Sequence, residues 1–344
     1  MKSDLNIIRQ SNIELLRIIA MSMIIILHYF THVISKLEEY ENISFICKPI
    51  FIYGVNVFFI ISGFFKTKLN LKTLLGLILV VLFFNLENIL LLILFGQEIN
   101  FIVIFNSVFF PITHSYYWFV KVYLFIIILS PIINLTEFIP EKKLFIISLI
   151  FLIFTLYSCG IGHNEVNPSG YTFLQGILMY ILGIQLSIFA KKKTFIKYKS
   201  SILILFIITT IIASLLNYLF KGRYFEQYNS ITSIFGSIFL FIIFQTKTIR
   251  SNIINIIAKI SFGCYLLQDG IFGYKFLYNK LISLMIYLNT FNFIILLLIV
   301  FILFWIFSFF FTTVNDKIVY YFMSKISIFY IKLKKLISNN SWGL

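Results

Sequence analysis

An arginine and a histidine in the first hydrophobic stretch are the residues of this sequence best suited to chemistry. Arg17 and His28 lie in the run NIELLRIIAMSMIIILHYF, where most other side chains are apolar. Hydrocarbon tolerates ionisable side chains poorly, so such residues within a membrane helix indicate a functional site. A histidine can take a proton from a hydroxyl group near neutral pH. An arginine donates hydrogen bonds in a planar fork that suits a phosphate, a carboxylate or a helix-ending carbonyl.

The spacing of the two residues places them on one face of a helix. Arg17 and His28 are 11 residues apart, which is close to three turns at about 3.6 residues per turn. At a rise of about 1.5 Å per residue, they lie about 16 Å apart along the axis. Glu14 and His32 extend the same polar stripe at its two ends. Glu14 and Arg17 either belong to a functional site or only pair at the membrane interface and set the orientation of the helix.

Three later segments carry further candidates. In the segment from Gly54 to Phe64, Asn56 is expected near the level of His28, where it can hydrogen-bond a substrate hydroxyl group. Ser62, in the same segment, is a second candidate, although the spacing of the small residues there is better explained by contacts between closely packed helices. Asp269 follows a later hydrophobic segment and is expected near its outer end.

Trp118 and Lys121 open another hydrophobic run. Tryptophan at such a position is typical of a membrane interface. Lys121 either extends outward to that interface or stabilises developing negative charge beside His28. Glu87, a second ionisable residue in an apolar segment, is a candidate partner for Lys121.

The composition excludes a soluble globular protein. Hydrophobic residues make up 60% of the 344 residues and charged residues only 12%, and the mean hydropathy is +0.98. Such a chain is typical of an all-α polytopic membrane protein, whose spans need about 17–25 residues each. The three cysteines, Cys47, Cys159 and Cys264, match no metal-binding or redox spacing, so we predict no metal site.

The hydrophobic pattern predicts about ten transmembrane helices. They cover roughly residues 13–34, 47–65, 72–95, 118–135, 143–159, 171–190, 201–220, 229–246, 253–273 and 291–314. With both termini in the cytoplasm, most of the 28 lysine and arginine residues fall on cytoplasmic segments, as the positive-inside rule requires. Arg17, Lys121 and Lys259 are the cations that this topology places within or at the border of the membrane. The net charge of +15 therefore reflects topology and attraction to lipids, and we predict no nucleic-acid partner.

These segments form one predicted transmembrane domain over residues 1–344. Residues 1–12 are a cytoplasmic N-terminus, residues 13–314 contain the spans, and residues 315–344 are a cytoplasmic amphipathic tail. The tail mixes aromatic residues with lysines, which is typical of a helix lying along a membrane surface. Residues 97–117 are too polar to span the membrane and are expected to form a re-entrant or surface segment on the outer side.

Four short motifs are spread from residue 14 to residue 270. They are Arg17 with His28; Gly54, Phe58, Phe59 and Ser62-Gly63-Phe64; Tyr117-Trp118-Phe119 with Ser130-Pro131; and Gly263-Cys264-Tyr265-Leu266-Leu267-Gln268-Asp269. In order and spacing the set resembles the integral-membrane acyltransferase family 3, the bacterial sugar O-acyltransferases, and is most similar to capsular polysaccharide acetyltransferases. The chain departs from the family pattern where Gln268 replaces a frequent histidine, where Asn56 replaces a frequent aspartate, and where an arginine-rich segment is reduced to Lys66, Lys68 and Lys72.

The resemblance implies a membrane enzyme of the bacterial cytoplasmic membrane. Such an enzyme moves an acetyl or other short acyl group from cytoplasmic acyl-CoA to a hydroxyl group of an extracytoplasmic or lipid-linked glycan. His28 would be the base or a transient acyl carrier, and Arg17 would position the donor. The supporting or substrate-binding residues would be Glu14, Asn56, Ser62, Trp118, Lys121 and Asp269. Acetyl-CoA is then a co-substrate, membrane lipids are partners and no metal is needed.

The alternative interpretation involves no covalent chemistry. A transporter or flippase for a lipid-linked glycan or a small solute would use Arg17 and Lys121 to bind phosphate, and its histidines would respond to pH. The two functions differ in outcome, because a transporter moves its substrate intact whereas an acyltransferase adds an ester.

Overall fold

The computed structural model describes residues 10–113, 116–157, 166–192, 194–222 and 224–339. Over these residues the chain is helical and contains no strand, as the all-α prediction requires. His114, Cys159 and His163 lie outside the described residues. The polytopic, all-helical fold class predicted from composition is therefore confirmed.

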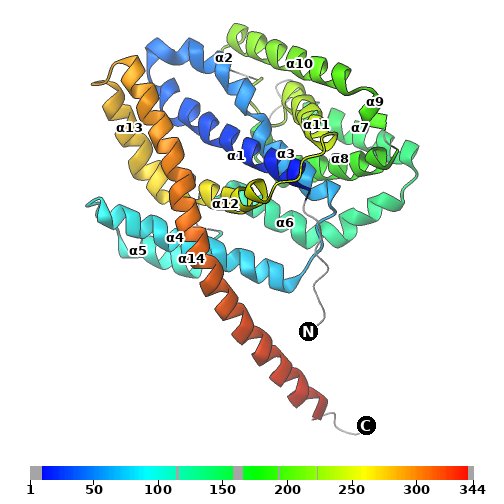
Figure 1. Cartoon of the computed structure of the whole chain (residues 1–344), viewed down its shortest axis with the longest axis vertical. Coiled ribbons are helices and arrows are strands. Elements are labelled where there is room, and N and C mark those ends of the chain that lie inside the picture. Colours follow the sequence, from blue (N-terminus) through cyan, green and yellow to red (C-terminus); the bar gives the residue numbers. More distant parts are fainter. Residues whose placement is uncertain (1–9, 114–115, 158–165, 193, 223, 340–344) are drawn as a thin grey trace.

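The helices form one bundle from which a single helix projects (Figure 1). Their bounds are α1 Ser11–His32, α2 Glu41–Phe51, α3 Tyr53–Phe64, α4 Leu71–Leu94, α5 Phe101–Phe109, α6 Trp118–Ile133, α7 Glu141–Tyr157, α8 Phe173–Lys191, α9 Thr194–Lys197, α10 Lys199–Leu219, α11 Ile231–Gln245, α12 Asn252–Gln268, α13 Tyr278–Met285 and α14 Thr290–Asn339. Short helical turns, among them η3 (Asn134–Phe138) and η5 (Gly273–Leu277), join some of them.

Seven segments of the described chain are long and apolar enough to cross a membrane. They contain α1, α2 with α3, α4, α6, α8, α10 and α14. Helices α7, α11 and α12 have only 15–17 residues, which is at or below the length that a span needs. The count of about ten spans and the cytoplasmic position of the termini therefore stay predictions.

Glycines allow the central helices α3 and α8 to pack closely. A Cβ atom at Gly63 of α3 would overlap the backbone carbonyl of Tyr180, and one at Gly183 of α8 would overlap that of Ile60. Small residues let helix backbones approach in this way where no hydrophobic effect drives association. Gly63 is thus a packing residue, and the pair α3–α8 forms a rigid centre for the bundle.

Helices α1 and α12 run parallel and in register. At one end, the Ser11 hydroxyl donates to the Ser251 carbonyl (3.4 Å), and the Ser251 amide donates to the Ser11 hydroxyl (3.1 Å). At the other end, His28 lies beside Asp269, which directly follows α12. Equal levels of the two helices therefore face each other along their whole length.

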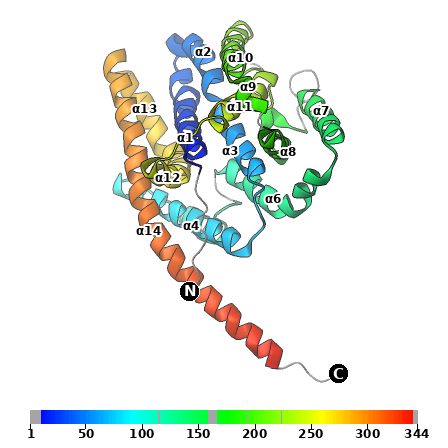
Figure 2. The same cartoon turned by 45° about the vertical axis from the view of Figure 1, so that its right-hand side comes forward.

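The C-terminal segment differs from the expected separate surface helix. Helix α14 has 50 residues and continues without a break through Asn315 and Asp316, where the sequence suggested a boundary. Its C-terminal end extends away from all other helices in both views (Figures 1 and 2). The described tail is thus a continuation of the last long apolar helix.

In the described part of residues 97–117 the one helix is the short α5, which lies against α4. Its nine residues are too few to span a membrane. The Asn85 side chain of α4 donates a hydrogen bond of 3.0 Å to the Pro111 carbonyl and so holds the segment in place.

Candidate active site

A large cavity of about 590 Å³ opens at the end of the bundle where Arg17 lies. Helices α1, α3, α4, α6, α12 and α14 contribute to its walls. Four charged residues line it, namely Glu14, Arg17, Lys259 and Asp316. Ser62, Thr67 and Thr73 add hydroxyl groups, whereas the inner end is aromatic. The cavity can therefore hold an elongated ligand with an anionic end.

Arg17 is held by Glu14 in a way that leaves it facing the cavity. Its Nη1 atom donates to both carboxylate oxygens of Glu14, at 3.1 and 3.3 Å. The side chain of Glu14 is only 9% exposed and that of Arg17 is 34% exposed. The predicted pair thus exists and lines the cavity, so Glu14 orients Arg17 toward whatever enters.

Lys259 is a second cation of this cavity, to which the sequence assigned no role. It lies on α12 and, like Arg17, lines the large cavity. Because α1 and α12 are parallel and in register, the two residues lie at similar levels on neighbouring helices. The sequence indicated Lys259 only as an ionisable residue in an apolar segment. The packing of α12 against α1 shows that Arg17 and Lys259 line one cavity.

His28 lies deeper in the bundle and is only 8% exposed. Its Nδ1 atom is 3.9 Å from Oδ1 of Asp269 and 3.5 Å from the hydroxyl of Tyr278. The ring of His32 contacts it edge-on, with centroids 5.3 Å apart. One carboxylate and several aromatic rings therefore fix the orientation of the imidazole.

Asp269 is fully buried at the C-terminal end of α12. The hydroxyl groups of Tyr265 and Tyr274 come near its carboxylate, but neither carboxylate oxygen completes a hydrogen bond of standard geometry with a described residue. A buried carboxylate needs a charged or hydrogen-bonding partner. Protonation of His28, 3.9 Å away, would supply that partner.

A polar network anchors the end of α12 that carries Asp269. The Leu266 carbonyl accepts hydrogen bonds from the Tyr117 hydroxyl (2.8 Å) and from the Asn88 side chain (3.1 Å). Asn88 also accepts from the Phe272 amide at 3.3 Å. All four residues of this network are buried, and such satisfied networks make a local structure rigid. Asp269 is thereby placed by α4 and α6 as well as by its own helix.

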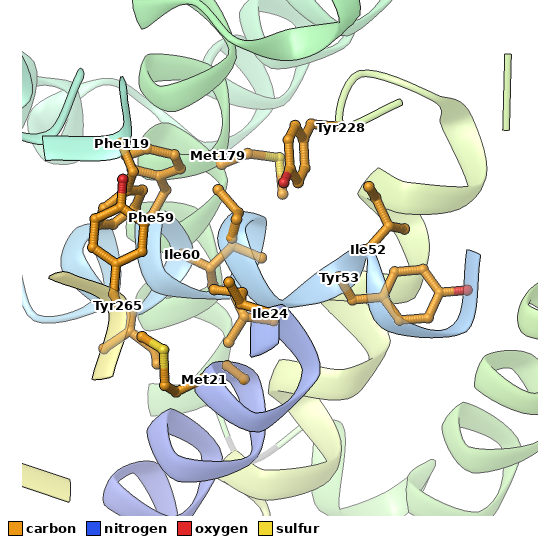
Figure 3. Packing of buried hydrophobic residues seen from close by; sticks show 14 of the residues in the cluster. Met21, Ile24, Ile52, Tyr53, Phe59, Ile60, Phe119, Met179, Tyr228 and Tyr265 are labelled. Atoms are coloured by element: carbon orange, nitrogen blue, oxygen red, sulfur yellow. The ribbon is translucent and has the colours of Figure 1, made fainter. Parts of the chain in front are cut away.

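A middle chamber of about 40 Å³ adjoins His28. It shares Phe58, Phe119 and Phe262 with the large cavity, so it lies directly beyond the aromatic inner end of that cavity. In Figure 3 the rings of Phe119 and Tyr265 lie together, with Met21 of α1 beneath them. The full lining is Met21, Ile24, His28, Val55, Phe58, Trp118, Phe119, Tyr228, Phe262 and Tyr265.

A far cavity of about 130 Å³ lies on the other side of the middle chamber. The two share His28, Trp118 and Tyr228. The indole of Trp118 contacts the rings of Tyr171 and Tyr228, with centroids 4.6 and 5.3 Å apart. The remaining lining residues are Leu27, Thr31, His32, Lys48, Ile52, Glu226 and Tyr274. The aromatic group and the ion pair of Lys48 with Glu226, at 3.3 Å, suit a polar ring with hydroxyl groups.

The three cavities therefore follow one another along the bundle, and His28 lines two of them. Arg17 marks one end of the row and His32 the other. A ligand anchored near Arg17 and a second ligand in the far cavity would meet at the imidazole of His28. Such an arrangement suits the transfer of a group from one ligand to the other.

The remaining predicted site residues occupy different environments. Trp118 lines the middle chamber and the far cavity, and Ser62 lines the large cavity. Asn56 lines none of the three and is fully buried. Its side chain donates to the Tyr228 carbonyl at 2.9 Å and accepts from Gln175 at 3.2 Å. Asn56 thus positions Tyr228.

Lys121 does not lie beside His28. It is exposed on α6 and lines none of the three cavities. Glu87, its suggested partner, instead lies near Asn315 of α14. Of the two interpretations of Lys121, the outward-facing one describes its position. Trp118 is half-buried and lines two cavities, whereas Lys121, one turn further along α6, is exposed.

No metal centre is found in the described part of the chain. Within it, no three histidine, cysteine, aspartate or glutamate side chains lie close enough to hold an ion.

Comparison with known proteins identifies the family of the chain. The model of the acyltransferase 3 family, described as an acyltransferase domain, matches residues 10–331. No curated protein and no solved structure gives a significant match. The matched region contains every residue that lines the three cavities. The chain therefore belongs to the acyltransferase 3 family and is a membrane acyltransferase.

Proposed function

We propose that the chain transfers a short acyl group from cytoplasmic acyl-CoA to a hydroxyl group of an extracytoplasmic or lipid-linked glycan in the bacterial cytoplasmic membrane. The observation that carries this proposal is the position of His28, which lines both the middle chamber and the far cavity. An imidazole at the junction of two ligand spaces can act on both ligands. Acetyl-CoA is the proposed donor.

The donor enters through the large cavity. Its phosphate groups contact Arg17 and Lys259, the two cations of the lining, since guanidinium and ammonium groups bind phosphate strongly. Glu14 keeps Arg17 in position. The distance of about 16 Å from Arg17 to His28 along a helix is of the order of a pantetheine arm, so the thioester reaches the middle chamber.

The acceptor occupies the far cavity. Trp118, Tyr171 and Tyr228 offer ring faces against which a sugar can pack. Asn56 fixes the backbone of Tyr228 and so the shape of this wall. An acceptor hydroxyl group directed at His28 then lies next to the thioester carbonyl.

The chemical step is a general-base-assisted attack. His28 takes the proton of the acceptor hydroxyl while its oxygen forms a bond to the carbonyl carbon. The carbon–sulfur bond breaks, its electron pair leaves with sulfur, and the thiolate takes the proton back from the imidazolium. Asp269 stabilises the imidazolium between these steps. In the variant route a ring nitrogen of His28 attacks the thioester carbon and the CoA thiolate leaves. The acceptor oxygen then attacks the acyl-imidazole, the nitrogen–carbon bond breaks, and the thiolate takes the hydroxyl proton.

Ligand-dependent melting of the purified protein in nanodiscs tests the donor site. Acetyl-CoA should raise the melting temperature of the native chain, because a ligand that binds the folded state stabilises it by mass action. Arg17→Ala and Lys259→Gln should lose most of that shift, and His28→Ala should keep it but transfer no acyl group. Lys142→Gln, an exposed lysine outside the cavities, is the matched control and should behave as the native chain.

Two outcomes contradict the proposal. An unchanged melting temperature at millimolar acetyl-CoA would contradict the donor site and favour the transporter or flippase interpretation, in which a glycan crosses without gaining an ester. Full acyl transfer by His28→Ala would contradict the role of His28.

A further inference from the structure

The middle chamber is small compared with any acyl chain longer than a few carbons. Its volume is about 40 Å³, whereas a protein cavity that holds benzene has about 150 Å³. An acetyl group adds one methyl group beyond the thioester carbonyl and fits such a space. Each further methylene needs room that the chamber does not contain.

The chamber is also apolar apart from a few groups. Six of its lining side chains carry no nitrogen or oxygen atom, namely Met21, Ile24, Val55, Phe58, Phe119 and Phe262. The others are His28 and three aromatic residues with a hydroxyl or an indole N–H group. No lysine or arginine lines it. A carboxylate at the end of an acyl group, as in a succinyl group, would be buried here without a cationic partner, which is strongly unfavourable.

The walls of the chamber are held by their own packing. Phe119 contacts Phe59, Tyr265 and Tyr123, with ring centroids 4.9, 5.7 and 5.8 Å apart. On the opposite side α3 lies close against α1, because a Cβ atom at Gly54 would lie 2.5 Å from the Ala20 carbonyl oxygen. Close-packed interiors accommodate added methylene groups only at a cost. The chamber therefore cannot widen freely for a longer acyl group.

We propose that the middle chamber selects the acyl group by size and charge, so that the donor carries a short, uncharged acyl group. Met21 and Ile24 of α1 are the residues that set the length, since both are buried and line the chamber from the helix that carries His28. This inference rests on the proposed acyl transfer. It specifies in addition which acyl-CoA thioesters are substrates.

The experiment compares acetyl-, butanoyl-, hexanoyl- and succinyl-CoA. Membranes from cells that express the chain and contain its acceptor are incubated with each thioester, and the release of free CoA thiol is measured above the level of His28→Ala membranes. Acetyl-CoA should react fastest. Hexanoyl- and succinyl-CoA should react at least about 100-fold more slowly, because a pocket discriminates about 10-fold or more where added groups do not fit.

Variants distinguish an effect of the chamber lining from a general effect of weakened packing. Met21→Ala and Ile24→Ala should each raise the ratio of the hexanoyl to the acetyl rate at least about 10-fold, because they remove side-chain volume from the wall. Ile25→Ala is the matched control. Ile25 is fully buried on the same helix but does not line the chamber, so its ratio should stay within about 2-fold of the native value. Met21→Leu conserves the side-chain volume, so its ratio of the hexanoyl to the acetyl rate should equal the native value. This result can be measured even if Met21→Ala folds poorly.

The outcomes distinguish this inference from the function on which it rests. Equal rates with acetyl- and hexanoyl-CoA, or an unchanged ratio in both alanine variants, would overturn the size selection and leave acyl transfer intact. Rapid transfer from succinyl-CoA would overturn the charge selection. Release of CoA from none of the thioesters would overturn the proposed function and the inference together.

Discussion

At the residue scale, the environment of His28 determines what its imidazole can do. The carboxylate of Asp269 lies 3.9 Å from Nδ1, and the hydroxyl of Tyr278 lies 3.5 Å from the same atom. The sequence showed that His28 and Asp269 are ionisable residues of apolar segments. Their proximity arises only because α12 packs along α1. We therefore assign Asp269 a positioning role, which it performs through His28.

Removal of the charge of Asp269 should slow transfer without abolishing donor binding. Asp269→Asn keeps the shape of the side chain but no longer stabilises a protonated His28, so kcat should fall about 100-fold or more. The KM for acetyl-CoA should stay near the native value, because Asp269 does not line the large cavity. Steady-state kinetics of CoA release measure both constants. A rise in KM with an unchanged kcat would contradict the positioning role.

At the scale of the elements, the site depends on how closely helices approach one another. Gly63 and Gly183 allow the backbones of α3 and α8 to touch. Helix α3 contributes Ser62 to the large cavity, and Gln175 of α8 donates a hydrogen bond to the carbonyl of Tyr228 in the wall of the far cavity. The sequence offered two explanations for the small residues of α3, as packing contacts or as part of a site. The structure assigns Gly63 to packing, whereas Ser62 beside it lines the large cavity.

Two glycines form a matched pair that tests this packing. Gly63→Ala places a Cβ atom against the Tyr180 backbone and should destabilise the protein by about 1–3 kcal/mol, as overpacking of a close contact does. Gly76→Ala, on α4, meets no atom within 4 Å, so its effect should be neutral or slightly stabilising because alanine favours helices. Thermal melting in detergent measures both changes. Equal melting temperatures for the two variants would contradict the close contact.

At the scale of the whole molecule, the row of three cavities runs from Arg17 to the far cavity that contains His32. Ion pairs lie at both ends of the bundle. Lys191 and Lys192 pair with Glu137 and Glu141 at the end near Arg17, at 3.5 and 2.6 Å. Lys48 pairs with Glu226 at the far end. Transfer across a membrane requires that these two ends face opposite sides of it.

Cysteine labelling in intact cells tests that orientation. Glu39 and Lys143 are exposed residues near opposite ends of the bundle. The positive-inside rule predicts that Glu39→Cys reacts with a membrane-impermeant maleimide in intact cells and that Lys143→Cys reacts only after permeabilisation. The unsubstituted chain gives the background from its own cysteines. The reverse pattern would contradict a cytoplasmic donor.

The sequence by itself determined the all-helical membrane class and the location of most helices, and it indicated Arg17 and His28 as candidate site residues. It did so because hydrophobic length and the rarity of ionisable groups in apolar segments are local properties. Only the tertiary structure decided which of those groups share a site. Lys259 joins Arg17, whereas Lys121 faces outward. Contacts between distant helices depend on side-chain packing and on the rotation of each helix, which no local pattern specifies.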